Sequence, residues 1–218
     1  MTKKILILFL LVVIIIVGAL VYFNHQKPKG PPKVETILMP EKTLSNKKAV
    51  MIIAFKDFRD AEYFVPREVL EKAGIEVKTA SNKKGLAIGA DGGEVNVDLL
   101  IEEIDPKNFD AIIFVGGPGC LSNLDNENSY QLARKTIEEN KVLAAICISP
   151  VILAKAGVLK EKKATVWSSP FDKSPIKILK ENGAIYQENN VVVDGKIITA
   201  NGPSAAEKFA QAIIDSLK

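Results

Sequence analysis

Short, uninterrupted apolar runs that are rich in Val and Ile alternate with helical patterns along most of this chain. Three of them are "AVMIIAF" at 49–55, "DAIIFV" at 110–115 and "VLAAI" at 142–146. A strand with one solvent-exposed face alternates apolar and polar residues, whereas a strand buried on both faces is apolar throughout. The pattern therefore predicts the α/β class, with a mostly parallel sheet covered by helices on both faces.

The remaining elements follow from periodicity and turn residues. A helical pattern runs through Tyr63 and Leu70 and stops at Gly74. The other expected elements are a strand at 75–81, a hairpin or irregular excursion at 87–98, helices at 127–140, 150–157 and near 173–182, a hairpin at 190–200 and a closing helix at 205–217. In such sheets chemistry lies at the carboxyl ends of the strands. We therefore examine the loop after Phe55, the turn at 116–119 and Cys147.

The N-terminal residues differ in composition from the rest of the chain. Residues 5–23 are apolar throughout and contain no charged side chain, which is long enough to span a bilayer as a helix. We expect a single-pass N-terminal membrane anchor there; a cleaved signal peptide, with small residues at 17–19, is the alternative. Residues 24–47, rich in Pro and Lys, are expected to be a linker, and residues 48–218 the folded domain. Lysines flank residues 5–23 on both sides, so the side of the membrane stays open, an extracytoplasmic domain included.

The net charge of +3 is unevenly distributed. Residues 1–48 hold eight Lys and two Glu, a net of +6, so the remaining chain has a net of −3. The basic excess flanks the expected anchor, where anionic lipid head groups would attract it. We therefore expect no nucleic-acid partner.

Metal and cofactor signals are weak. The chain has two cysteines, Cys120 and Cys147, and one histidine, His25, so four ligands at metal spacing are missing. The "GGPG" turn at 116–119 lacks the Lys-Ser/Thr of a P-loop and the third glycine of a dinucleotide fingerprint. We expect neither a cofactor nor a metal.

Cys147 lies where a buried strand turns directly into a helix. A nucleophile elbow has this arrangement, and a helix N-terminus favours thiolate. A small buried core cysteine would have the same surroundings. The residues alone leave both readings open.

Two neighbouring features have a similar ambiguity. Gly116 and Gly117 could present backbone N–H groups to an oxyanion or form a plain tight turn. Glu62, after the first strand, could share a proton with the Cys147 sulfur or simply complement the helix dipole. Asp57 and Asp60 are weaker candidates for that role.

The chain resembles the DJ-1/PfpI (ThiJ/PfpI) family over about residues 48–217. The resemblance is carried in order by "FRDAEYFVPREVLEKAG", "GADGGEVNVD", "DAIIFVGGPG", "LAAICISPVILAKAGVL", "ATVWSSP" and "VVVDGKIITANGP". It implies a flavodoxin-like three-layer sandwich, a reactive cysteine at a nucleophile elbow and a homodimer. The family's cysteine falls on Cys147, its glutamate on Glu62 and its oxyanion N–H groups on Gly117 and Ile148, with Gly116 in support.

The chain also departs from the family. The protease-like branch has a histidine after the cysteine, where this chain has Ile148, and another branch has a downstream histidine where Ser169 stands. Because no histidine lies in the domain, neither Cys–His pairing can form within one chain.

The expected function is therefore a membrane-tethered, cysteine-dependent hydrolase or lyase activity on small reactive carbonyls, or protein repair. Small electrophiles or proteins would be its substrates. The alternatives are a redox sensor or chaperone that works through Cys147 oxidation, and a cysteine peptidase, which the missing histidine disfavours.

Overall fold

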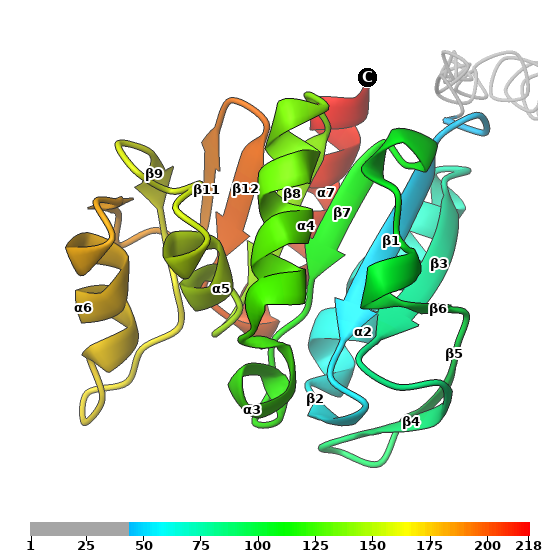
Figure 1. Ribbon diagram of the computed structural model, residues 1–218, viewed down its shortest axis with the longest axis horizontal. Coiled ribbons are helices and arrows are strands. Elements are labelled where there is room, and N and C mark those ends of the chain that lie inside the picture. The colour runs from blue at the N-terminus through cyan, green and yellow to red at the C-terminus, as the bar shows by residue number, and fades with distance from the viewer. Residues whose placement is uncertain (1–43) are drawn as a thin grey trace, which may run out of the picture. The chain divides into compact units, whose positions relative to one another are not determined.

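The computed structural model describes residues 44–218. Its centre is a seven-stranded sheet in the order β11-β12-β8-β7-β1-β3-β6, in which β11 alone runs antiparallel to its neighbour (Figure 1). The strands are β1 (Lys48–Ile53), β3 (Glu76–Ser81), β6 (Leu99–Leu100), β7 (Ala111–Phe114), β8 (Val142–Ile146), β11 (Val191–Asp194) and β12 (Ile197–Ala200). The predicted mostly parallel sheet is confirmed.

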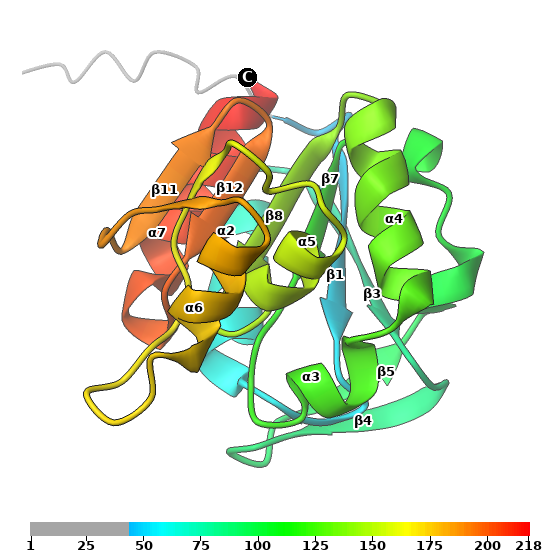
Figure 2. The ribbon, with the colours of Figure 1, turned by 60° about the vertical axis from the view of Figure 1, so that its left-hand side comes forward.

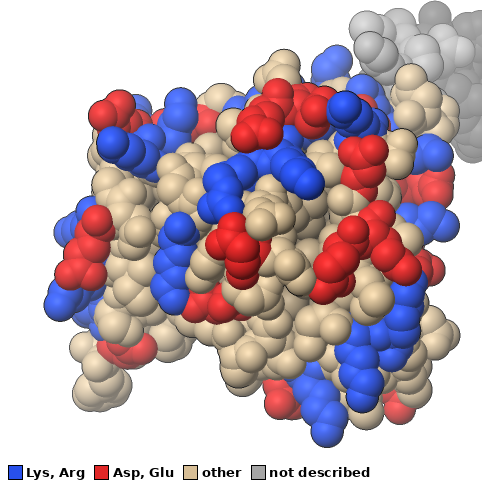
Figure 3. Space-filling model, viewed as in Figure 1, with Lys and Arg blue, Asp and Glu red and all other residues tan. Residues whose placement is uncertain are grey.

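Helices cover both faces of the sheet. The helices α4 and α5 pack on one face, with α6 beside α5, while α2 and α7 pack together on the other (Figures 1 and 2). The helices are α2 (Asp60–Lys72), α3 (Cys120–Leu124), α4 (Glu127–Glu138), α5 (Pro150–Lys155), α6 (Ser174–Glu181) and α7 (Ala206–Leu217). Single 3₁₀ turns occupy Ile101–Glu103, Pro106–Asn108 and Pro203–Ala205. The arrangement is a flavodoxin-like three-layer sandwich, as expected. Acidic and basic side chains are interspersed over the face drawn in Figure 3.

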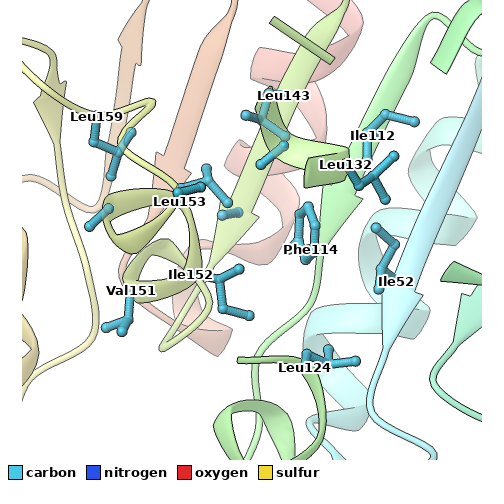
Figure 4. Close-up of a cluster of buried hydrophobic side chains, with 14 of the residues drawn as sticks. Ile52, Ile112, Phe114, Leu124, Leu132, Leu143, Val151, Ile152, Leu153 and Leu159 are labelled. Carbon is cyan, nitrogen blue, oxygen red and sulfur yellow. The ribbon is translucent and has the colours of Figure 1, made fainter. Parts of the chain in front are cut away.

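Burial on both faces explains the uninterrupted apolar strands. Along β1, Val50 and Ile52 point to the face that α4 and α5 cover, whereas Met51 and Ile53 point to the face of α2 and α7. On the first face Ile52, with Ile112, Phe114 and Leu143 from the neighbouring strands, lies against Leu132 of α4 and Ile152 of α5 (Figure 4). Each such side chain contributes about 1.5–3 kcal/mol when it is fully buried.

Two small sheets lie outside the central one. The first joins β2 (Lys56–Phe58), β4 (Gly85–Gly89) and β5 (Glu94–Val97), so the expected hairpin at 87–98 is present. The second pairs β9 (Lys163–Ala164) with β10 (Ile185–Tyr186). The Asp60 carboxylate accepts the N–H groups of Asp91 and Gly93, at 2.8 and 2.6 Å, and so fixes the tip of the β4–β5 hairpin over the first turn of α2.

The described part begins before the first strand. Leu44 is 3% exposed and its N–H donates to the Ala73 carbonyl at 3.0 Å, so Leu44–Lys47, expected in the linker, pack on the folded unit. The expected anchor at 5–23 and the rest of the expected linker lie outside the described residues. Within residues 44–218 no helix is both long and apolar enough to cross a membrane.

Candidate functional site

Cys147 occupies a strained turn between β8 and α5. Its φ is +65°, a left-handed conformation that residues other than glycine rarely adopt. Hydrogen bonds hold the backbone there on both sides: the Cys147 N–H donates to Ala200 O at 2.9 Å, and the Cys147 carbonyl accepts the Trp167 N–H at 2.8 Å. Such strain persists only where surrounding structure imposes it, and it is concentrated at functional sites.

Ser149 closes this turn. Its buried Oγ accepts the Ile146 N–H at 3.0 Å and lies 2.8 Å from the carbonyl oxygens of Phe114 and Ile146. The side chain therefore joins the ends of β7 and β8 beneath Cys147. This role of Ser149 was not predicted from the sequence. The signal was one hydroxyl residue between two apolar runs, which does not reveal which carbonyls it meets.

Gly116 and Gly117 lie directly against the elbow. A Cβ on Gly116 would come within 2.5 Å of the Cys147 Cβ and 2.7 Å of Glu62 Oε2. Gly117 has a φ of +115°, and a Cβ there would collide with the Arg59 nitrogen. The Arg59 N–H also donates to Gly116 O at 3.1 Å, which ties the start of α2 to this turn. Only glycines allow the three segments to approach so closely.

Glu62 lies in the first turn of α2 and is fully buried. Within the described residues no donor reaches either carboxyl oxygen with full hydrogen-bond geometry. Burial raises the pKa of Glu62 to about 7, against the opposing effects of the Cys147 side chain, the Arg59 guanidinium and the Gly116 N–H. Near neutral pH this carboxyl group can therefore both give and take a proton.

The Cys147 thiol titrates together with this carboxyl. Burial, and next the charge and hydrogen bonding of Glu62, raise the pKa of Cys147 to about 12, while the N–H groups of Gly117 and Ile148 lower it. Two negative charges in one buried site are unfavourable, so the pair keeps at least one proton across the neutral range. The same two amides would hold an anion on the sulfur or on an oxygen beside it.

A pocket of about 510 Å³ opens onto these groups. Its lining comprises Arg59, Ala61, Glu62, Asp91, Gly117, Pro118, Leu121, Cys147, Ile148, Trp167 and Pro203. The structure thus brings together Cys147, Glu62, Gly117 and Ile148, with Gly116 behind them. Within residues 44–218 no group of His, Cys, Asp and Glu side chains is placed to hold a metal ion.

Ser169, a predicted supporting residue, and Cys120, the second cysteine, do not line the pocket. The Ser169 Oγ accepts the N–H groups of Phe171 and Asp172, at 3.2 and 3.0 Å, within its own loop. Cys120 is fully buried at the start of α3, and burial raises the pKa of its thiol well above the ordinary value.

Arg59 and Asp91 also line the pocket, and neither was predicted from the sequence as a site residue. Arg59 Nη1 lies 3.1 and 3.2 Å from the two carboxylate oxygens of Asp91. The two residues are 32 positions apart, and the hairpin that brings them together has no local sequence signal for this contact.

Comparison with known proteins gives a consistent result. The model of the DJ-1/PfpI family matches residues 47–216. An uncharacterised protein of Methanocaldococcus jannaschii is 42% identical over 80% of this chain and 84% of its own length. The protein named deglycase PfpI of Pyrococcus furiosus is 32% identical over 78% of this chain and 99% of its own. A protein of Caenorhabditis elegans named glutathione-independent glyoxalase is 28% identical over 80% and 90%.

The fold comparison agrees. The crystal structure of a ThiJ/PfpI domain protein from Brachyspira murdochii superposes with a TM-score of 0.74 at 35% identity, covering 78% of this chain and 95% of that one. Relatives of this chain thus include proteins named deglycase and glyoxalase. The chain belongs to the DJ-1/PfpI family.

Proposed function

We propose that the protein is a Cys147-dependent enzyme that converts small reactive carbonyls, with 2-oxoaldehydes as its substrates. The observation that carries the proposal is that one thiol, one proton-sharing carboxyl group and two residues with backbone N–H groups near the sulfur line a single pocket. These are the parts that covalent addition to a carbonyl requires. The names of the relatives support the same class of substrate.

Addition is the first step. The Glu62 carboxylate takes the proton of the Cys147 thiol, the resulting thiolate attacks the aldehyde carbon, the sulfur–carbon bond forms, and the electron pair of the C=O bond moves onto oxygen. The N–H groups of Gly117 and Ile148 stabilise this oxyanion, and the Glu62 carboxyl group then donates its proton to it. The product is a neutral hemithioacetal, and Glu62 is left as a carboxylate.

The Glu62 carboxylate is then available as a base. It removes the proton from the former aldehyde carbon and returns it to the neighbouring carbonyl carbon, while the hydroxyl proton of the hemithioacetal passes to the oxygen of that neighbouring carbonyl. The adduct is thereby isomerised to a 2-hydroxy thioester. Water hydrolyses this thioester to a 2-hydroxy acid and releases the thiol. The net reaction adds one water to the 2-oxoaldehyde and consumes no oxidant or reductant.

Peptide hydrolysis is a weaker fit to the same residues. An amine leaving group needs a positioned acid, which cysteine peptidases take from histidine. The chain has one histidine, His25, outside the described residues, and Ile148 follows the cysteine. Loss of such an acid costs about 100- to 10,000-fold in rate. Aldehyde addition has no amine to expel, so this loss affects it less.

The test is production of lactate from methylglyoxal. The wild-type protein and Cys120→Ala should form lactate, whereas Cys147→Ala should form none and Glu62→Gln should be roughly 100- to 10,000-fold slower. Lactate formation that survives Cys147→Ala at the wild-type rate would refute the proposal.

We further propose that residues 5–23 anchor the protein in a membrane and that the domain forms a homodimer.

A further inference from the structure

The lining of the pocket includes a cationic group that the chemistry above does not use. Among the lining residues, all of which belong to the described part of the chain, Arg59 is the one with a positive charge. Its guanidinium is close enough to Glu62 to lower the pKa of that carboxyl group. The positive charge therefore acts at the site where a substrate meets Cys147.

The position of Arg59 is fixed by the fold. It is the residue before α2, and its N–H is bonded to Gly116 O, next to the amide of Gly117 that faces the sulfur. The backbone of Arg59 is thus anchored to the oxyanion turn. A guanidinium built on such a base presents its N–H groups in a rigid fork that matches a carboxylate.

A carboxylate of the protein, that of Asp91, binds one end of that fork. Asp91 binds Nη1 alone, and its side chain is 57% exposed compared with 33% for Arg59. An exposed arginine–carboxylate pair contributes little to stability because water competes for both partners. A ligand carboxylate that is held in the pocket by a bond to Cys147 can replace Asp91 at low cost.

We propose that Arg59 makes the pocket selective for carbonyl compounds that carry a carboxylate, with Asp91 as the internal carboxylate that such a substrate displaces. The proposal rests on the function proposed above for its reaction and adds the charge of the substrate. Neutral compounds such as methylglyoxal still react at Cys147, but they gain nothing from Arg59.

Two alkylating reagents of nearly equal size test the charge preference without any turnover. Iodoacetate is anionic and iodoacetamide is neutral, and both react with the Cys147 thiolate. The ratio of their rate constants cancels changes in thiolate content and isolates the contribution of the charge. Peptide mass spectrometry measures both rates at Cys147 in the full chain.

Arg59→Gln should lower the iodoacetate-to-iodoacetamide ratio roughly tenfold, the effect of about one charge-assisted hydrogen bond. Asp91→Asn should raise it, because that change frees the guanidinium and removes a competing negative charge. Lys72→Gln removes one positive charge from the last turn of the same helix, where Lys72 is 72% exposed and pairs with Glu68, and should leave the ratio unchanged.

An unchanged ratio in Arg59→Gln, or an equal loss in Lys72→Gln, would overturn the proposal. Asp91→Asn keeps the test decisive if Arg59→Gln does not fold, since an unchanged or lower ratio in Asp91→Asn also contradicts it. Lactate formation that does not depend on Cys147 would refute the proposed function alone, because the alkylation ratio does not depend on turnover.

Discussion

At the scale of single residues, the pairing of Cys147 with Glu62 decides the chemistry. A free thiol loses its proton with little help, but here burial and the neighbouring carboxyl group both oppose the thiolate. The same burial holds a proton on Glu62 up to about pH 7. The site therefore stores one proton beside the sulfur, where an adding carbonyl can take it.

Glu62→Gln should move the pH dependence of Cys147 alkylation to lower pH. In the wild-type protein the Glu62 charge opposes formation of the thiolate, and the variant lacks that charge while burial and the amides of Gly117 and Ile148 stay in place. Iodoacetamide rates measured against pH give the midpoint. Glu68→Gln, an acid lost from the exposed side of the same helix, is the control. A midpoint unchanged in Glu62→Gln would show that Glu62 acts only on the helix dipole.

The same substitution should change how stability depends on pH. Because the pKa of Glu62 rises from 4.5 to about 7 on folding, its contribution is full below pH 4.5 and is lost as the pH rises through 7. At about 1.4 kcal/mol for each pKa unit, the loss is about 3 kcal/mol. Urea unfolding measures the free energy of unfolding of both proteins at pH 4 and at pH 8. Between these two pH values the wild type should lose about 3 kcal/mol more of this free energy than Glu62→Gln does. If the free energy of unfolding changed with pH by the same amount in both proteins, that result would contradict the buried, protonated state of Glu62.

At the scale of elements, the site depends on how closely the turn after β7 approaches the elbow after β8. Gly116→Ala should lower the rate of Cys147 alkylation roughly 10- to 100-fold, because the new Cβ would push against both the Cys147 Cβ and Glu62 Oε2. Gly195→Ala, in the β11–β12 turn with no atom within 4 Å, should cost about 1 kcal/mol of stability and leave alkylation unchanged. Equal alkylation rates in the two variants would show that the close approach does not matter.

The elements that the sequence predicted are those whose burial leaves a strong local pattern. Both hairpins and the long helices α2, α4 and α7 were predicted because periodicity and turn residues mark them. The two-residue strands β6, β9 and β10 were not, since so short a segment has no period and forms only when a distant partner is in place.

The features of the candidate site could likewise be predicted from the sequence only in part. The position of Cys147 at the end of a strand could be predicted, but its φ of +65° and the three close contacts of Ser149 Oγ could not. Those features, like the contact between Arg59 and Asp91, depend on segments that are far apart in the sequence. They are set by packing, which no local pattern records.

At the scale of the whole described unit, the chain enters at the end of the sheet opposite to the pocket. Leu44 bonds to Ala73 just after the last turn of α2, whereas Glu62 lies in the first turn of that helix. A 13-residue helix is about 20 Å long. The site and the point where the chain enters are therefore separated by the length of α2.

Because the pocket and the entry point of the chain lie at opposite ends of α2, we predict that a membrane anchor at residues 5–23 leaves the pocket accessible. If residues 5–23 anchor the protein, the full chain should stay in the membrane fraction through a carbonate wash, and a chain that begins at residue 42 should not. Both should react with iodoacetamide at Cys147 at the same rate, because the first described residue, Leu44, lies at the end of α2 opposite to the elbow. The shortened chain keeps Leu44, whose side chain is buried in the core, so its folded unit is complete. Full chain that washes off the membrane would contradict the anchor. Slower alkylation in the tethered form would instead mean that the pocket faces the lipid surface.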